Sequence, residues 1–289
     1  MTVLPATRTA GRKRGSLSIG RIVAYAVLLI FAVIYLYPFF IQLFTSIKTD
    51  TDATNNPLSL VPRPLTWDAF TRLKDTDFPL WFFNSAWVSV IITIGRVFFD
   101  SLAGYALARI SFRGRSALFG AVLAVMAVPG VILLIPKFLV LNQLGMYNSP
   151  SALVVPLLAD AAGVFIMKQF FESVPASVEE AARIDGAGTF RIFWSVVLPM
   201  ARPALITLTI LSFQASWNEL PHFIVASQDP KLYTLTKGVA SLTSGQLGSG
   251  NQFPLTMGAA LLMTIPVAAV FVIFQRFFIA DENEGAVKG

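Results

Sequence analysis

The sequence contains no cysteine and a single histidine, His222. Without cysteine there is no disulfide, no thiol nucleophile and no cysteine-ligated metal. His222 follows Pro221 and has no nucleophile or cluster of metal ligands near it in the sequence, so we expect it to be a surface residue of a loop. The sequence therefore predicts no catalytic residue and no metal site, which argues against a membrane enzyme.

Charged residues are also scarce, at 13% of the 289 residues, whereas hydrophobic residues make up 55%. The mean hydropathy is +0.68. A soluble domain of this length would need more polar surface to stay in solution, but a protein surrounded by lipid would not. The composition therefore predicts a membrane protein.

Long apolar segments recur along the chain, and a membrane-spanning helix needs roughly 20 mostly apolar residues. None of these segments alternates in the way that strands of a β-barrel do. The sequence predicts an all-α polytopic membrane protein with six transmembrane helices, at about residues 22–47, 81–107, 117–141, 152–171, 196–218 and 255–280. Almost every segment contains proline, which either kinks the helix or marks a transport path, and the sequence leaves both interpretations open.

The distribution of basic residues predicts the orientation. The run Arg12-Lys13-Arg14 and Arg21 precede the first apolar segment, which is too long for the core of a cleaved signal peptide, about 7–15 residues. A cytoplasmic N-terminus gives the inner segments about twice as many Lys and Arg residues as the outer ones, as the positive-inside rule requires. We therefore expect both termini in the cytoplasm, and the net charge of +6 gives no reason to expect nucleic acid as a partner.

The domain organisation predicted from these segments is simple. Residues 1–18 form a flexible basic cytoplasmic tail, and residues 19–289 form a single transmembrane domain. We expect outer loops at about 48–79 and 219–253, and a large inner loop at about 172–195.

The inner loop contains a short polar helix. Ser177 and Glu180 have the spacing of a capping box, so we expect the helix to begin at Ser177. Val178, Ala181 and Ala182 would then share one smooth face that suits close packing in a shallow groove. Glu180 either completes the capping box or bonds a basic residue on a docked partner, and these two roles are compatible.

The same loop carries signals for the end of this helix and the start of the next. Gly186 can end the first helix in the left-handed conformation. Thr189 is a candidate cap for a second helix that runs through Phe190, Phe193 and Trp194 toward the next apolar segment.

The run Glu180-Ala181-Ala182, followed by Gly186, Val196 and Leu198-Pro199, resembles the signature of permease subunits of bacterial ABC importers. The run 182–187 most resembles the carbohydrate-uptake, maltose-type branch. The resemblance covers nearly the whole chain after the tail, with further matches at Asn84-Ser85, Tyr105-Ala106-Leu107-Ala108-Arg109, Trp217-Asn218-Glu219 and residues 285–289. The chain departs from that branch at Glu219, where Asp is more usual, and in the acidic run 281–284, which replaces a Gly-Leu-Thr-like stretch.

The resemblance implies a protein of the bacterial plasma (inner) membrane that does not hydrolyse ATP itself. Its implied partners are a second homologous permease, two ATPase subunits that hold ATP and Mg²⁺, an extracytoplasmic substrate-binding protein and the lipid bilayer. A coupling helix at 177–188 would then sit in a cleft of one ATPase subunit. The residues expected to make that contact are Glu180, Ala181, Ala182, Asp185 and Gly186.

Four residues are candidates for the substrate path. Asp160 is an isolated carboxylate in an apolar segment, which either contacts a polyol or amine substrate or pairs across the permease interface. Gln214, Trp217 and Asn218 could line a sugar path, although helix–helix hydrogen bonds are a competing role for them. Arg96 and Asp100 are four residues apart, and we expect them to form an intrahelical ion pair.

The outer loop at 219–253 is either the contact for the binding protein or a mobile surface loop. In maltose-type systems the corresponding loop helps to displace sugar from the binding protein. Its candidate contact residues are Ser244, Gly245, Gln246, Gly248 and Gly250, in a stretch of small residues.

Two alternatives remain among transporters. An ABC permease for amino acids or peptides is the closer one, although the run 182–187 and the C-terminal glycine motif favour carbohydrate. A secondary transporter driven by an ion gradient would need no docking helix and commonly has more spans, and only Asp160 suggests it. The sequence does not identify the sugar, but a sugar phosphate fits poorly with spans that contain one Arg and two Asp.

Overall fold

The computed structural model describes residues 19–243 and 252–285, and all regular structure in these ranges is helical. Four helices or helix pairs are long and apolar enough to cross a membrane: α1 (Ile19–Ser46), α4 (Phe78–Arg109), α7 with α8 (Pro150–Val154 and Ala161–Ser173) and α15 (Phe253–Gly285). Two further helix pairs pass the same test but are bent. The described chain therefore has four candidate spans, or six if each bent pair is one span.

The third predicted span is not one helix. Its first half is α5 (Arg115–Met126), and its second half is the 3₁₀ turn η1 (Gly130–Leu133) with α6 (Leu134–Gln143). The two halves are bent by 100°. Pro129 lies at the break, where it has no N–H to continue the helix and disfavours helical backbone in the residue before it.

The fifth predicted span is also broken. The helix α10 (Thr189–Ile192) continues through a π-helical segment, η3 (Phe193–Val197), into α11 (Leu198–Met200), and then bends by 81° into α12 (Arg202–Trp217). Pro203 lies in the first turn of α12, where a missing N–H costs nothing. Prolines thus start new helices here rather than merely kinking old ones.

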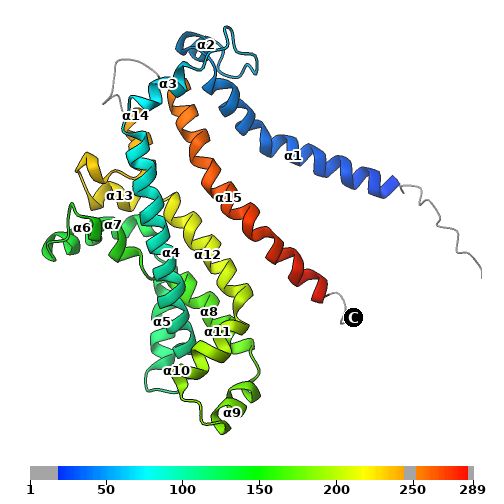
Figure 1. Ribbon diagram of the computed structural model, residues 1–289, viewed down its shortest axis with the longest axis vertical. Coiled ribbons are helices and arrows are strands. Elements are labelled where there is room, and N and C mark those ends of the chain that lie inside the picture. Colours follow the sequence, from blue (N-terminus) through cyan, green and yellow to red (C-terminus); the bar gives the residue numbers. More distant parts are fainter. Residues whose placement is uncertain (1–18, 244–251, 286–289) are drawn as a thin grey trace, which may run out of the picture.

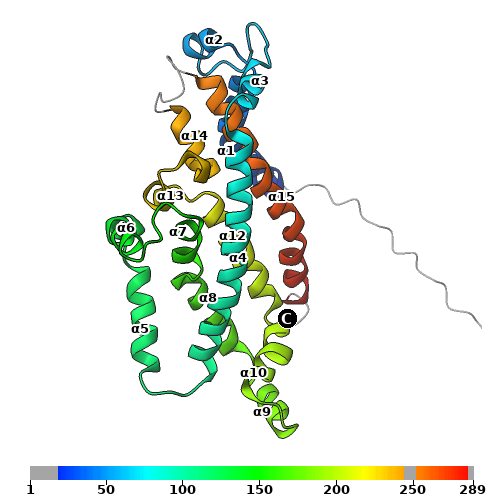
Figure 2. The same cartoon turned by 60° about the vertical axis from the view of Figure 1, so that its left-hand side comes forward.

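The molecule is elongated, with the long helices running between two ends (Figure 1). One end, called here the α9 end, carries α9 (Ala176–Ile184) and α10. The opposite end carries the short helices α2 (Asp50–Asn55), α3 (Asp68–Lys74) and α14 (Leu235–Thr243). The helix α13 (Pro221–Ala226) lies further from that end, beside α6 and α7, and η4 (Pro230–Leu232) follows it in the chain before α14. Figure 2 shows α5 upright and α6 turned across its top.

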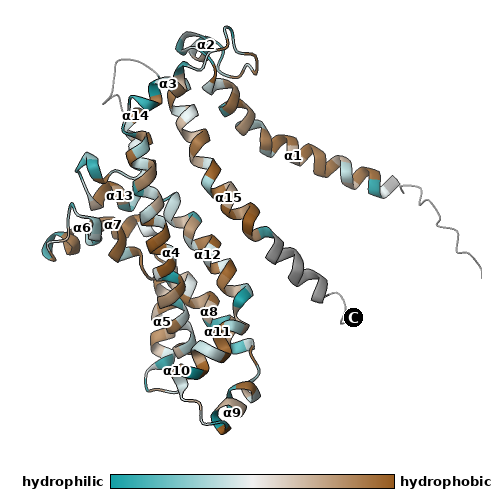
Figure 3. Cartoon of the chain, viewed as in Figure 1, coloured by the Kyte–Doolittle hydropathy of each residue, from teal (hydrophilic) through white to brown (hydrophobic). Residues whose placement is uncertain are grey.

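The helix α1 makes its main helix contact with α15 and diverges from the rest of the bundle (Figure 1). Its most apolar stretch is wholly exposed, and Figure 3 shows that stretch as mostly hydrophobic. A helix that is apolar on all sides is stable only if lipid or another protein surrounds it. The exposed apolar surface of α1 thus fits the predicted membrane location.

The centre of the bundle is a close pairing of α4 with α8. A Cβ added to Gly104 of α4 would lie 2.7 Å from Cβ of Met167 and 2.9 Å from the backbone nitrogen of Lys168. A Cβ added to Gly163 of α8 would lie 2.1 Å from Oδ2 of Asp100. Small residues let membrane helices approach this closely. The helices α4 and α8 therefore cannot slide past each other without first moving apart.

The expected ion pair between Arg96 and Asp100 is not formed. The Nε of Arg96 instead donates to the carbonyl of Leu157 at 2.8 Å, and Oδ1 of Asp100 accepts from the backbone N–H of Asp160 at 2.9 Å. The break between the 3₁₀ turn η2 (Val155–Leu157) and α8 leaves these backbone groups without helical partners. Because unsatisfied backbone groups are costly inside a membrane, both side chains bind the broken segment rather than each other.

The described part of the outer loop, residues 219–243, is folded against the bundle, so the mobile-loop interpretation is wrong for it. Leu235 and Val239 of α14 are buried with Trp81 of α4. Asn84 donates to the carbonyls of Lys231 and Tyr233 at 2.8 and 2.9 Å. The adjacent Ser85 accepts the N–H of Leu235 at 2.7 Å.

His222 is buried, with 1% of its surface exposed, so its expected surface position is wrong. Its Nε2 lies 3.0 Å from the carbonyl of Ala152, and burial lowers the pKa of His222. Lys237 is also buried, and its Nζ donates to the carbonyls of Phe223 and Ser227 near the end of α13. Burial lowers the pKa of Lys237 to about 8. Both residues lie in short helices that fold back on α4 and α7, which their local sequence does not reveal.

Candidate functional site

The start of α9 differs from the one that the sequence predicts. It begins at Ala176, directly after Pro175, and no side chain caps it, so the expected capping box of Ser177 with Glu180 is wrong. The extended backbone of Pro175 (φ −59°, ψ 131°) sets the start of the helix one residue earlier. Likewise Thr189 is the first residue of α10 rather than its cap, which is Gly188.

Gly186 ends α9 in the left-handed conformation, with φ at 81°, as the sequence predicts. The N–H of Gly186 donates to the carbonyl of Arg183, and that of Ala187 donates to the carbonyl of Ala182, each at 3.0 Å. This pattern satisfies two carbonyls of the last turn and reverses the chain. The reversal directs α10 back toward the bundle.

The two faces of α9 differ from the expected arrangement. Val178 and Ala182 are half-buried, and Ala182 packs on the core of the bundle, so they do not share an open face with Ala181. The exposed side instead carries residues at helical spacing, called here the α9 stripe: Ser177, Glu180, Ala181 and Ile184. Ile184 is 87% exposed.

Glu179, which our sequence reasoning passed over, is the acidic residue that α9 buries, with 4% exposed. Its Oε1 lies 3.2 Å from Nε of Arg109, and its Oε2 lies 3.5 Å from Nη2 of Arg183. The hydroxyl of Tyr105 donates to Oε2 at 3.3 Å. One carboxylate therefore faces two guanidinium groups and a phenol, which is the compensation that a buried charge requires.

A groove of about 550 Å³ lies between α1, α12 and α15. Its polar lining residues are Gln42, Gln214, Asn218 and Thr264, and its aromatic ones are Phe39, Phe213 and Phe271. Amide and hydroxyl groups can bond sugar hydroxyls, and aromatic faces can pack on a sugar ring. The structure thus brings two predicted path residues, Gln214 and Asn218, to one groove and adds Gln42 and Thr264.

Trp217 does not line this groove. It is 1% exposed, its Nε1 donates to the carbonyl of Met263 at 3.1 Å, and its ring packs on Phe82 and Phe213. Its expected stacking on a sugar is therefore replaced by helix packing in this conformation. Asp160 is half-buried, away from the groove, at the N-terminus of α8. Its role stays a prediction.

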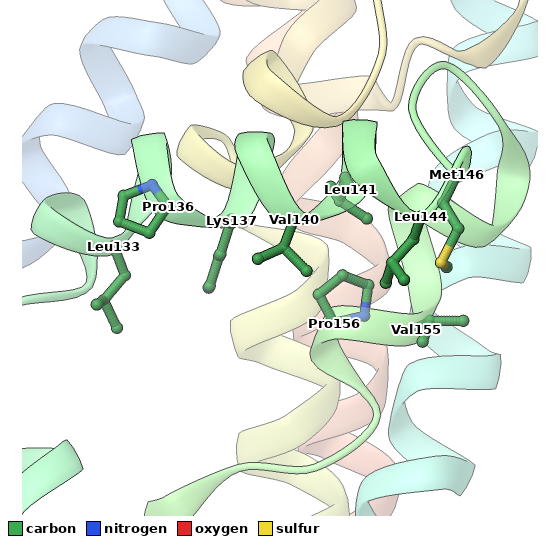
Figure 4. Close-up of a pocket in the computed structure, with 9 residues that line it drawn as sticks. All are labelled: Leu133, Pro136, Lys137, Val140, Leu141, Leu144, Met146, Val155 and Pro156. Atoms are coloured by element: carbon green, nitrogen blue, oxygen red, sulfur yellow. The ribbon is translucent and has the colours of Figure 1, made fainter.

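A second groove of about 360 Å³ lies beneath α6 and is almost wholly apolar. Figure 4 shows Leu133 at the end of η1 and Lys137 and Val140 of α6 projecting to one side, with Val155 and Pro156 below. Lys137 makes no ion pair within the described ranges.

The predicted binding-protein contacts Ser244, Gly245, Gln246, Gly248 and Gly250 lie outside the described residues, as do the acidic side chains of 281–284. Within the part of the chain that the structure describes, no group of three or more His, Cys, Asp or Glu residues could hold a metal ion.

The sequence contains signals for Gln42, Thr264 and Glu179, but each signal allows more than one interpretation. Gln42 and Thr264 are polar residues in apolar spans, a pattern that only a neighbouring helix can interpret. Glu179 and Glu180 are adjacent acidic residues, and the helix start decides which one faces the bundle.

The chain matches known proteins over most of its length. Residues 100–280 match the family described as "Binding-protein-dependent transport system inner membrane component". The arabinooligosaccharides transport system permease protein AraQ of Halalkalibacterium halodurans is 32% identical, over 89% of this chain and 93% of that protein. The sn-glycerol-3-phosphate transport system permease protein UgpE of Yersinia enterocolitica is 30% identical, over 89% and 94%.

Among solved structures, a chain of a bacterial ABC transporter involved in the import of the acidic polysaccharide alginate has a TM-score of 0.76 and 26% identity. The match covers 94% of this chain and 100% of that one.

Proposed function

The chain belongs to the family of binding-protein-dependent transport system inner membrane components, and from this premise we propose how its parts serve import. It is a permease subunit of an ATP-driven importer of the inner membrane. We propose that its substrate is a sugar or sugar derivative, that α9 couples it to an ATPase, and that both termini lie in the cytoplasm.

The relatives and the groove support a sugar substrate. The matched proteins are named for arabinooligosaccharides, sn-glycerol 3-phosphate and alginate, all of which present two or more hydroxyl groups. The groove between α1, α12 and α15 offers amides and aromatic rings and no charged side chain. A neutral saccharide suits this lining better than an amino acid, whose two charges would need counter-charges. An amino-acid or peptide permease is therefore the less favoured alternative.

The orientation rests on charge and on the broken spans. If each bent pair counts as one crossing, the chain crosses six times and both termini lie on one side. The α9 end is rich in Arg, with Arg109, Arg113, Arg115, Arg191 and Arg202 near it, as cytoplasmic segments are. On this orientation the opposite end, with α2, α3 and α14, faces the binding protein.

The observation that carries the coupling role is the α9 stripe. A short helix lies across the cytoplasmic end, fixed to the bundle through one face and bare on the other. Ile184, at the end of α9, is the large apolar residue of the bare face, and Glu180 lies one turn before it, where it can meet a basic residue of the partner. A gradient-driven transporter has no use for such a surface, which makes that alternative the weaker one.

The implied mechanism needs no chemical step in this chain. Two permease subunits form the pore, each docked on one of two ATPase subunits that bind ATP and Mg²⁺ and hydrolyse the ATP. Closure of the ATPase pair draws the coupling helices together and turns the pore outward. ATP must bind one global state better than the other for this to work.

A reconstituted complex tests the proposal. Vesicles that hold this chain with its second permease, ATPase and binding protein should take up labelled oligosaccharides, and not amino acids, only when ATP is supplied. Ile184→Ala should weaken ATPase docking about tenfold or more, because a buried isoleucine contributes roughly 1.5–3 kcal/mol. Leu58→Ala, at an exposed leucine of the opposite end, is the matched control. Equal docking of the two variants would refute the role of α9.

A further inference from the structure

The buried carboxylate of Glu179 connects α9 to the bundle through a side chain, in addition to the backbone connection. Two residues link α8 to α9, and this connection alone would hold α9 near the bundle. Yet Glu179 adds a tie to a different helix, because Arg109 is the last residue of α4. The two side chains in this pair are 14% and 5% exposed, so water screens their attraction little.

Arg109 also contacts the end of α8. Its Nη2 donates to the carbonyl of Phe171 at 2.5 Å and to the carbonyl of Val174. Phe171 lies in the last turn of α8, where its carbonyl also accepts the N–H of the C-cap residue Val174 at 3.3 Å, and the carbonyl of Val174 lies just beyond the helix. One guanidinium thus joins the ends of α4 and α8 to α9, which uses the several donors that an arginine presents in fixed directions.

The pairing of α4 with α8 extends this junction along the bundle. Gly104 lies about one and a half turns from Arg109 and meets Met167 and Lys168, whereas Gly163 meets Asp100, so the close contact covers residues 163–168 of α8. Asp100 closes the contact by bonding the N–H of Asp160. Without slack between α4 and α8, a force on α9 moves both helices together.

We propose that Arg109 and Glu179 are positioning residues of the transport cycle, which fasten the coupling helix to α4 and α8 so that the three move as one rigid body. This inference rests on the proposed coupling role of α9. The pair lies on the side of α9 opposite the docking stripe, so it acts after docking: it determines whether movement of the ATPase reaches the spans.

The test separates docking from transmission. Glu179→Gln keeps the shape of the side chain and leaves the α9 stripe intact, so the complex should assemble and hydrolyse ATP. Sugar imported per ATP hydrolysed, both measured in the same vesicles, should fall about tenfold, within the roughly 5- to 150-fold range of typical coupling free energies. Glu172→Gln is the matched control, since Glu172 pairs with Lys168 and Arg115 nearby but is 38% exposed. An equal ratio of import to hydrolysis in the two variants overturns the proposal.

A second measurement does not depend on the folding of the Glu179→Gln variant. The chain has no cysteine, so Phe99→Cys on α4 and Ala176→Cys on α9 can be spin-labelled in the purified chain, without competing thiols, before the complex is assembled. In the assembled complex the distance between the labels should stay the same with and without ATP, and a change would overturn the rigid connection. Failure of the proposed function looks different, because the unmodified chain would then not dock the ATPase or not import sugar.

Discussion

The turn that ends α9 allows a sharp prediction, because its strain can be isolated from all other effects. Gly186 has φ at 81°, and a Cβ added to it would meet no atom within 4 Å. A substitution therefore costs only the left-handed backbone, about 1–2 kcal/mol for an ordinary L-residue. That free energy should raise the open population of the turn about 5- to 30-fold.

Hydrogen exchange measures this population directly. The N–H groups of Gly186 and Ala187 close the turn, so their exchange reports its opening. For Gly186→Ser we expect the N–H groups of residues 186 and 187 to lose protection about 5- to 30-fold, relative to the unmodified chain. Gly186→Asn should lose less, since asparagine tolerates this conformation, and Gly186→Val should lose more.

Gly188 provides the matched control. It too has open space around its Cβ, but its backbone is extended, with φ −73° and ψ 161°, and it caps α10. Gly188→Ser should therefore leave exchange unchanged or slow it, because serine is a favoured N-cap. Equal effects of serine at 186 and 188, or equal effects of Asn and Val at 186, would refute the argument from backbone strain.

Three further predictions concern other parts of the molecule. Gln214→Leu should raise the KM of sugar uptake, because it removes an amide from the groove. Gln143→Leu, at an exposed glutamine of α6, should leave KM unchanged, and equal KM values in the two variants would contradict the assignment of the groove. Gly163→Ala should destabilise the detergent-solubilised permease by about 1–3 kcal/mol, seen as a lower thermal midpoint, because its Cβ would lie 2.1 Å from Oδ2 of the buried Asp100. Gly120→Ala, where a Cβ meets nothing within 4 Å, should be neutral or stabilising, and a similar loss there would refute the packing argument. The sole histidine, His222, has a pKa lowered from 6.5 by burial, so the unfolded chain binds more protons below that pH. Hydrogen exchange of α13, corrected for its intrinsic pH dependence, should therefore show stability falling as the pH drops below 6.5, and His222→Gln should abolish the effect.

The groove between α1, α12 and α15 and the buried Trp217 show how the polar and aromatic residues of α12 divide between two faces. Gln214 and Asn218 lie one turn apart and face the groove, whereas Trp217 between them faces the core. A mixed run of polar and aromatic residues on one helix therefore divides by helical periodicity into residues that can meet substrate and residues that hold the helix in place.

The sequence by itself determined the helical membrane class, the approximate position of four of the six predicted spans, and the family. These follow from local quantities, namely the length of the apolar runs and a motif that can be read from residue spacing alone. The left-handed turn at Gly186 is local as well, because only glycine adopts such a backbone at little cost.

The tertiary structure alone decided which polar side chains are buried and with which groups they pair. Glu179 is buried rather than Glu180 because Arg109 and Tyr105, which lie more than one helix away in the sequence, meet one face of α9. Asp100 binds the backbone of Asp160 rather than Arg96 because the broken span brings an unpaired N–H to it. Burial and pairing depend on groups distant along the chain, and a buried polar group takes whichever partner the packing of the helices brings within reach.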